Sequence, residues 1–423
     1  MKFVKEEFKT LYATEDGTIY DQPQLVLLGR MGEVITPLEK EELIPLPEGA
    51  SLVMLPGRVP LGLDEERQEI VPYTQDLGRE LVAVGALLPQ GYTRTALPAF
   101  VRRKGAPRLP LYGYAAVGIL GDQIYVAAQK TDEDHHWNPK YFNGEELPCL
   151  VDRFKQEFPH NRLVKQLGHC ALEYSCFTAQ NLFYRRWEAG IPVSPACNAR
   201  CLGCISQQPA ECCPSPQERI RFVPEKREIV ELALPHLELA EEAIISFGQG
   251  CEGEPSLQYP LLKEVIGEIR SKTKAGTINI NTNAGDAVAI KTICEAGLDS
   301  MRVSLFSARP EQYNRYHQGR YQLEEVETSL KIAGQFGVYR SLNLLVYPGV
   351  TDREEEVEAL VDFLARTEIE MIQLRNLNID PDFLQEKILP QEGELLGIPL
   401  LIEILKEEFP QLRIGNYSRP KNK

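Results

Sequence analysis

Three cysteines stand close together in the run CNARCLGC of this 423-residue chain. Cys197, Cys201 and Cys204 have the spacing CxxxCxxC. Three thiolates ligate only three irons of a four-iron cubane, which leaves the fourth iron open for a substrate or cofactor. Zinc is the alternative metal, although its structural sites use four ligands and CxxC pairs. The spacing therefore favours a [4Fe-4S] cluster with one open iron.

The open iron determines what chemistry such a centre can perform. An amino and a carboxylate group can chelate it, which brings a sulfonium next to a reduced cluster that can donate an electron. Breaking the sulfur–carbon bond homolytically then gives a 5'-deoxyadenosyl radical. The cofactor carries this chemistry, and the protein holds the pieces and excludes side reactions. An external electron donor is an expected partner.

The elements that position these cysteines follow from the sequence after residue 190. Apolar strand-like runs alternate there with amphipathic helical segments, which predicts a parallel α/β sheet with its active face at the carboxyl ends of the strands. The six strand-like runs are GIPVSPA, AIISFGQG, TININ, SMRVSLFS, RSLNLLVYPG and MIQLRNLNID. Six strands are fewer than a closed (βα)8 barrel requires, so we expect a partial (βα)6 barrel with an open side.

This region resembles the radical S-adenosylmethionine (SAM) superfamily from about residue 190 to residue 390. The CxxxCxxC run follows the first strand, as in that family. Gly253, Glu254 and Pro255 resemble its glycine-glutamate-proline motif, in which the backbone and the glutamate hold the methionine amino group. The resemblance implies the following further contacts: Thr282 and Asn283 to the methionine carboxylate or ribose, Ser304 to the same part, and the backbone of Val346 and Gly349 to adenine.

Other cysteines flank the cluster motif and suggest a second metal. The four candidate ligands are Cys170, Cys176, Cys212 and Cys213. Four thiolates form a closed site for one iron or zinc ion. Cys149 is an alternative fourth ligand, because adjacent cysteines do not easily share one tetrahedral ion. Cys251 and Cys294 are expected to be packing residues.

The run CNARCLGCISQQPAECCPSPQERIRF followed by AIISFGQGCEGEP resembles the methanogenesis marker protein 10 family. Members of that family are cobalamin-dependent radical enzymes that methylate an arginine carbon in a partner protein. The resemblance implies a cysteine-bound single iron and an upstream tyrosine that can occupy the open iron, for which Tyr184 is the candidate. The chain differs from the family in its long N-terminal module and in having no DxHxxG sequence, so the use of cobalamin is left open.

These motifs predict a radical SAM enzyme that modifies a side chain of a protein or peptide. The resemblance implies C-methylation of arginine. A cobalamin-free oxidation or cross-link of a peptide is one alternative, and a non-catalytic iron–sulfur protein is another. Arg375 and Asn376, at the end of the sixth strand, are expected to orient the substrate.

Composition excludes several classes of protein. The formal net charge of −15 disfavours nonspecific binding to nucleic acid. No segment approaches the length of about 20 apolar residues that a membrane span needs. The start MKFVKEEFKTLY has no apolar core of a secretory signal. We therefore expect a cytoplasmic protein with neither nucleic acid nor membrane as a partner.

The sequence divides into four segments. Residues 1–145 have short β-branched or leucine-rich runs separated by Gly and Pro, which predicts a mostly β accessory module. Residues 146–190 have helical spacing and form a cysteine-containing connector, residues 191–390 form the radical SAM core, and residues 391–423 form a C-terminal extension.

Overall fold

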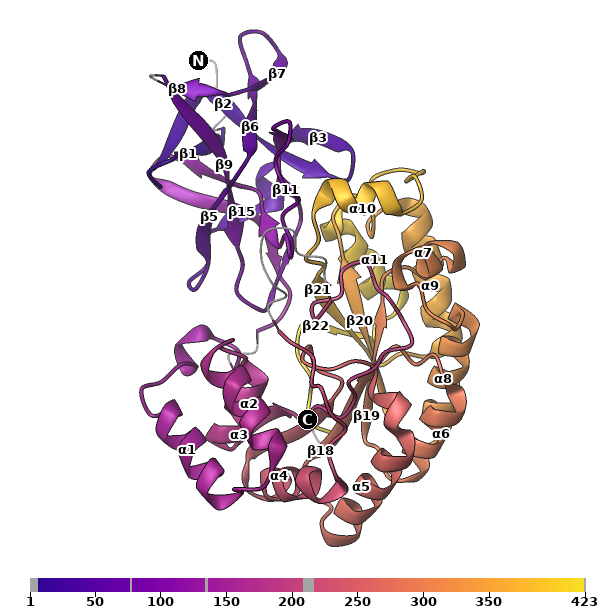
Figure 1. Ribbon diagram of the computed structural model, residues 1–423. Coiled ribbons are helices and arrows are strands. Elements are labelled where there is room, and N and C mark those ends of the chain that lie inside the picture. Colours follow the sequence, from indigo (N-terminus) through magenta and orange to yellow (C-terminus); the bar gives the residue numbers. More distant parts are fainter. Residues whose placement is uncertain (1–6, 77, 134–135, 208–216, 422–423) are drawn as a thin grey trace. The chain divides into compact units, whose positions relative to one another are not determined.

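The fold is shown as a computed structural model in Figure 1, and the structure describes residues 7–76, 78–133, 136–207 and 217–421. The chain forms two compact units. The first unit comprises Met1–Glu133, Leu345–Glu358 and Leu374–Pro410, and the second comprises Asp134–Leu344, Ala359–Gln373 and Gln411–Lys423. Each unit therefore combines segments that lie far apart in the sequence.

The first unit begins with an antiparallel sheet, as the Gly- and Pro-punctuated sequence predicts. Leu11, Val84, Val117 and Val126 lie in its buried apolar core. Its strands are β1 (Lys9–Thr14), β2 (Ile19–Met31), β3 (Val34–Pro37), β4 (Leu43–Pro45), β5 (Ser51–Leu55), β6 (Arg58–Asp64), β7 (Glu69–Pro72), β8 (Gln75–Asp76), β9 (Arg79–Leu87), β10 (Tyr92–Arg94), β11 (Leu97–Pro98), β12 (Phe100–Arg102), β13 (Tyr114–Ala115), β14 (Val117–Leu120) and β15 (Gln123–Lys130).

The later segments of the first unit carry α10 (Pro381–Lys387) and α11 (Ile398–Glu408). The fully buried Arg58 donates from Nη2 to Oδ2 of Asp380 at 3.0 Å, which ties β6 to the start of α10. Gly349 has φ +84°, and a Cβ there would lie 2.0 Å from the Gly32 nitrogen. Only glycine therefore allows the two backbones to approach this closely.

The second unit starts with the helical segment predicted as a connector. It forms the helices α1 (Leu147–Glu157), α2 (Arg162–Leu172) and α3 (Phe177–Tyr184). Arg185 takes a left-handed conformation with φ 54° and caps α3, because its N–H bonds the carbonyls of Asn181 and Leu182. The chain then enters the first strand of a parallel sheet.

That sheet has the order β16-β17-β18-β19-β20-β21-β22. Its strands are β16 (Arg186–Gly190), β17 (Glu241–Phe247), β18 (Thr277–Thr282), β19 (Ser300–Leu305), β20 (Tyr339–Val346), β21 (Met371–Asn376) and β22 (Arg413–Gly415). The α/β class and the open parallel sheet are confirmed, with one strand more than the six expected, because β22 pairs parallel with β21.

The first strand was predicted at GIPVSPA, and this position is wrong. The strand is RWEAG, and it ends at Gly190. The backbone N–H groups of Val193 and Ser194 bind the carboxylate of Glu252 in place of a neighbouring strand. The apolar run after the strand is therefore the beginning of the cysteine loop.

Helices alternate with the strands, as predicted. The helices expected from the sequence are α4 (Lys226–Leu239), α5 (Tyr259–Lys272), α6 (Ala287–Glu295), α8 (Leu323–Gln335) and α9 (Glu354–Thr367). Figure 1 shows α5, α6 and α8 side by side along one face of the sheet. A further helix, α7 (Pro310–His317), was not predicted. Within the described residues, no helix is long and apolar enough to cross a membrane.

Candidate functional site

The loop that carries the three cysteines is held from one side by the glycine-glutamate-proline segment. The N–H of Gly253 donates to the Ser194 carbonyl at 2.7 Å, and the N–H of Glu254 donates to the Ala196 carbonyl at 2.8 Å. A Cβ on Gly253 would lie 2.0 Å from the Ala196 oxygen, so glycine is required at this approach. The loops after β16 and β17 are thereby joined at the carboxyl ends of their strands.

The same cysteine loop is held from a second side by the carboxyl end of α7. The Arg200 N–H donates to the carbonyl of His317 and the Leu202 N–H donates to the carbonyl of Tyr316, both at 3.0 Å. The last carbonyls of a helix have no partner within the helix. The cysteine loop supplies these partners and is fixed by them.

Each thiol of the motif has its own hydrogen-bond partner. The Ala199 N–H lies 3.4 Å from Sγ of Cys197. Nδ1 of His317 lies 3.5 Å from Sγ of Cys201. Nη2 of Arg219 lies 3.4 Å from Sγ of Cys204. Burial raises the pKa of Cys197 and of Cys201. The charge of Cys204 raises both further, and the charge of Cys197 also raises the pKa of Cys201. The three thiols therefore lie close enough to interact electrostatically.

Glu254 provides a buried carboxylate beside these thiols. Its Oε1 accepts hydrogen bonds from the Ser256 N–H at 3.0 Å and from Thr282 Oγ1 at 2.5 Å, and its Oε2 accepts one from the Asn283 N–H at 2.8 Å. Burial raises the pKa of Glu254, and these donors oppose the rise. The charge of Glu254 in turn raises the pKa of Cys201, which indicates that carboxylate and thiol are near one another.

A second buried carboxylate, Glu252, was missed by the sequence reasoning. Its Oε2 accepts from the N–H groups of Val193 at 2.8 Å and Ser194 at 3.0 Å, and its Oε1 accepts from the Gly248 N–H. Burial raises its pKa to about 8, against the effect of these donors. Glu252 therefore joins the loops after β16 and β17. Its position between Gly250 and Gly253 in GQGCEGEP was the available sequence signal.

Thr282 and Asn283, the predicted cofactor contacts, both donate hydrogen bonds to the Glu254 carboxylate. Asn283 also donates from Nδ2 to Oδ1 of Asn198 at 2.6 Å, which connects the end of β18 to the cysteine loop. Ser304 lies half-buried on β19, in register with Asn343 of β20. Contacts of these three side chains to a bound cofactor remain predictions.

The backbone groups predicted to contact adenine have partners within the first unit. The Val346 carbonyl accepts from the N–H of Leu377 at 2.9 Å. The Gly349 N–H donates to Oδ1 of Asp352 at 2.6 Å. The adenine contacts of Val346 and Gly349 therefore remain predictions as well.

The side-chain amide of Asn376 is hydrogen-bonded to the backbone of β10. Its Nδ2 donates to the Tyr92 carbonyl at 2.9 Å, and its Oδ1 accepts from the Arg94 N–H at 3.0 Å. Both polar atoms of the amide thus bind the backbone of β10, and the role of Asn376 in orienting a substrate remains a prediction. Arg375 is half-buried, with Nη1 3.4 Å from Oε1 of Gln90, and its substrate role remains a prediction.

Tyr184 lies at the end of α3. Its hydroxyl accepts a hydrogen bond from the Gly144 N–H at 3.0 Å, and the Arg186 guanidinium carbon lies 4.2 Å from its ring centroid. Burial raises the pKa of the Tyr184 phenol. A role of Tyr184 at the open iron remains a prediction.

The candidate ligands of a second metal are only partly described. Cys212 and Cys213 lie outside the described residues. The thiol of Cys170, buried on α2, hydrogen-bonds that of Cys251, and this contact lowers the pKa of Cys170 and raises that of Cys251. The charge of Cys176 also acts on Cys251. Cys251 is therefore buried, as predicted, but in contact with a candidate ligand, whereas Cys149 is exposed.

The donor chemistry of the site fits a [4Fe-4S] cluster and SAM. In the described part of the chain, no three His, Cys, Asp or Glu side chains are gathered closely enough to hold one metal ion. A cubane takes each thiolate on a different iron, and N–H groups near the sulfurs suit thiolate ligands. The buried carboxylate of Glu254 suits the ammonium group of a methionine moiety, because a buried charge requires a partner.

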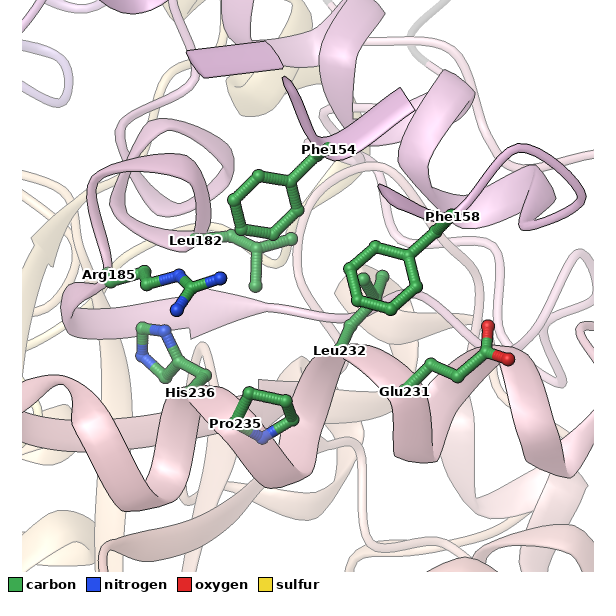
Figure 2. Close-up of a pocket in the computed structure, with 8 residues that line it drawn as sticks. All are labelled: Phe154, Phe158, Leu182, Arg185, Glu231, Leu232, Pro235 and His236. Atoms are coloured by element: carbon green, nitrogen blue, oxygen red, sulfur yellow. The ribbon is translucent and has the colours of Figure 1, made fainter. Parts of the chain in front are cut away.

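A separate small pocket lies among α1, α3 and α4 of the second unit and contains none of the predicted site residues (Figure 2). His236 at its edge is buried, and its Nε2 lies 2.9 Å from the Trp187 carbonyl. Burial lowers the pKa of His236 to about 4. The lining residues are Phe154, Phe158, Leu182, Arg185, Glu231, Leu232, Pro235 and His236.

A family match covers the part of the chain that contains the cysteine loop. Residues 191–364 match the Radical SAM superfamily. The GTP 3',8-cyclase of Limosilactobacillus fermentum is 26% identical over 201 residues, which are 45% of this chain and 53% of that protein. The chain thus spans about half the length of this curated relative.

The solved structures matched by the chain share little sequence with it. Methylornithine synthase (PylB) is 17% identical, with a TM-score of 0.39 over 62% of this chain and 77% of that one. SuiB of Streptococcus suis bound to S-adenosylmethionine is 13% identical, with a TM-score of 0.40 over 74% and 72%. A radical SAM methyltransferase from Sphaerobacter thermophilus is 16% identical, with a TM-score of 0.40 over 54% and 65%.

Proposed function

We propose that this chain is a radical SAM enzyme that modifies a side chain of a protein or peptide, because residues 191–364 match the Radical SAM superfamily. One observation carries the proposal. The cysteine loop brings three separately hydrogen-bonded thiols next to the buried carboxylate of Glu254. Such an arrangement serves a cofactor with an ammonium group beside a metal cluster.

The residues of the site have distinct roles in this proposal. Cys197, Cys201 and Cys204 ligate the cluster, and Glu254 accepts the ammonium group of SAM. When bound, the cluster and SAM supply an electron and a sulfonium, which together yield a 5'-deoxyadenosyl radical. Thr282 fixes the orientation of the Glu254 carboxylate through its hydrogen bond. Glu252 holds the two loops together and so keeps the distance between ligands and carboxylate constant.

C-methylation of arginine is the reaction that we propose. The support is the resemblance of CNARCLGCISQQPAECCPSPQERIRF and GQGCEGEP to the methanogenesis marker protein 10 family. A cobalamin-free oxidation or cross-link of a peptide is the second candidate reaction, because the chain has no DxHxxG sequence. An external reductant supplies the electron in both.

We also propose a second metal held by cysteines outside the CxxxCxxC motif. The observation in its favour is that Cys170 of α2 and Cys251 after β17 share a hydrogen bond although they lie far apart in the sequence. Cys176 lies near enough to affect the pKa of Cys251. Because no three described His, Cys, Asp or Glu side chains are close enough to hold one ion, the proposed site also requires Cys212 and Cys213, which lie outside the described residues. Iron or zinc fits thiolate ligands of this kind.

The substrate and the reaction can be tested together. The reconstituted chain would be incubated without oxygen with SAM, dithionite and arginine-containing peptides, with and without cobalamin, and GTP would serve as a competing substrate class. We expect a peptide heavier by one methyl group together with S-adenosylhomocysteine. A peptide lighter by two hydrogens would support the second candidate. Turnover of GTP with no change in any peptide would contradict the proposal.

A further inference from the structure

We propose that His317 is a positioning residue that donates a hydrogen bond from Nδ1 to Sγ of Cys201 and thereby raises the reduction potential of the bound cluster. The inference rests on the proposed function, because it requires Cys201 to ligate iron. It adds a role for α7, the helix that the sequence analysis did not predict.

The imidazole of His317 is fixed next to the cysteine loop. His317 is the last residue of α7 and is 1% exposed. Its Nδ1 lies 3.5 Å from Sγ of Cys201, a normal separation for a hydrogen bond to sulfur. The ring of Tyr313, one turn earlier, stacks on the imidazole with centroids 4.1 Å apart. The His317 carbonyl accepts the N–H of Arg200 from the same loop. Ring and backbone of His317 thus both face the loop that carries Cys201.

The second ring nitrogen decides the direction of the hydrogen bond. Nε2 of His317 is buried and has no hydrogen-bond partner among the residues that the structure describes. A neutral imidazole has one N–H and one lone pair. A proton on Nε2 would leave a buried donor unpaired and would turn a lone pair of Nδ1 toward the sulfur. A proton on Nδ1 leaves only a lone pair unpaired and gives the thiolate a donor, so this tautomer is favoured.

A donor at this position acts on the cluster through its ligand. Hydrogen bonds to the sulfurs are among the factors that set the potential of an iron–sulfur cluster. The donor withdraws electron density from the thiolate and so stabilises the reduced form, which carries one more negative charge. Burial strengthens the effect, because the local dielectric is low. Among the described residues, Cys197 receives its hydrogen bond from a backbone N–H. His317 is instead a side chain, so a mutation there can alter the potential.

The experiment compares two substitutions at one position. His317→Phe keeps an aromatic ring for stacking on Tyr313 and removes the N–H donor. His317→Asn loses the ring but keeps an amide N–H near the place of Nδ1. Arg315→Ala, on the exposed face of the same helix, is the control. Iron and sulfide content would be measured after anaerobic reconstitution, and the midpoint potential would be measured by a redox titration followed by electron paramagnetic resonance.

We expect full cluster content in every variant, a more negative potential in His317→Phe, and a potential close to that of the wild type in His317→Asn and Arg315→Ala. An unchanged potential in His317→Phe would overturn the inference. An equal shift in both His317 variants would also overturn it, because the ring and not the donor would then matter.

A measurement on the unmutated chain decides the matter where a variant loads no cluster. Histidine labelled with ¹⁵N should give a weak nitrogen coupling in pulsed paramagnetic resonance of the reduced cluster, and the absence of this coupling overturns the inference. A wild-type chain that binds no four-iron cluster would contradict the proposed function itself. A wild-type chain that binds the cluster and cleaves SAM without the coupling contradicts only the role of His317.

Discussion

Thr282 Oγ1 donates a hydrogen bond of 2.5 Å to the carboxylate of Glu254, although the two residues come from the ends of different strands. Thr282 is the last residue of β18, and Glu254 lies in the loop after β17. Both side chains are buried. The hydroxyl therefore fixes the carboxylate that we propose accepts the ammonium group of SAM.

Thr282→Val should weaken the binding of SAM. Valine has the shape of threonine without its hydroxyl, and a hydrogen bond to a charged group contributes about 1.5–3 kcal/mol. We expect the Kd of the cluster-loaded protein for SAM to rise about tenfold or more, since about 1.4 kcal/mol corresponds to a factor of ten. Equilibrium binding would measure this. Thr282→Ser, which keeps the hydroxyl, should bind nearly as the wild type does, and equal Kd values for the Val and Ser variants would refute the role of the hydroxyl.

Glu252→Gln should destabilise the second unit. The substitution turns an amide NH2 toward backbone N–H groups that now donate to a carboxylate oxygen. An unsatisfied buried group costs about 1–3 kcal/mol. We expect the free energy of unfolding of the metal-free chain to fall by about this amount in denaturant titrations.

A matched control for Glu252→Gln is Glu264→Gln. The Glu264 side chain is 66% exposed and its contact to Lys226 is 3.7 Å long. Its substitution should change the free energy of unfolding by no more than about 0.5 kcal/mol. Equal effects of the two substitutions would show that Glu252 does not join the loops.

His236 should make stability depend on pH. Burial lowers its pKa from 6.5 to about 4. Between these pH values the imidazole is protonated in the unfolded chain and neutral in the folded chain. The contribution of His236 is therefore fully present above pH 6.5 and is lost as the pH falls toward 4. We expect the wild type to lose about 3 kcal/mol more than His236→Gln over this range. Denaturant unfolding at several pH values would measure it, and identical pH profiles would contradict the burial of a neutral imidazole.

Cys251→Ser should remove a metal ion that is not part of the cluster. Cys251 and Cys170 share a hydrogen bond, so serine at 251 would deprive the proposed second site of a ligand. Elemental analysis should find one metal ion per chain fewer than in the wild type, with cluster iron and sulfide unchanged. Cys294→Ser is the control, because Cys294 is buried on α6 and was expected only to pack. Equal metal content in all three proteins would reject the second site.

The α/β core could be predicted because its strands are apolar and its helices are amphipathic. Ile245, Ile280 and Val303 are buried in neighbouring strands, and each expected helical pattern contains an observed helix, although the pattern that contains α4 runs on into the start of β17. The first strand was misplaced because RWEAG is not an apolar run. It contains Glu188, which is buried and accepts a hydrogen bond from Ser246 Oγ at 2.6 Å. A paired buried charge cannot be distinguished from an exposed one in a single sequence.

The motif residues of the proposed site could be found in the sequence because their spacing is local. The partners of those residues could not, because they depend on loops that converge only in the fold. α7 has a polar composition, and its signals were weak: Pro310 at its first position and aromatic side chains at Tyr313 and Tyr316. The contact of His317 with Cys201 spans 116 positions. No pattern of neighbouring residues predicts such a contact.

The central claim is that Cys197, Cys201 and Cys204 hold a cluster that cleaves SAM with Glu254 in place. The direct test is the formation of 5'-deoxyadenosine by the anaerobically reconstituted chain with SAM and dithionite. We predict that the wild type forms it, that Cys201→Ala does not, and that Glu254→Gln forms it with a raised KM for SAM. An intact four-iron cluster in the wild type without any 5'-deoxyadenosine would contradict the account.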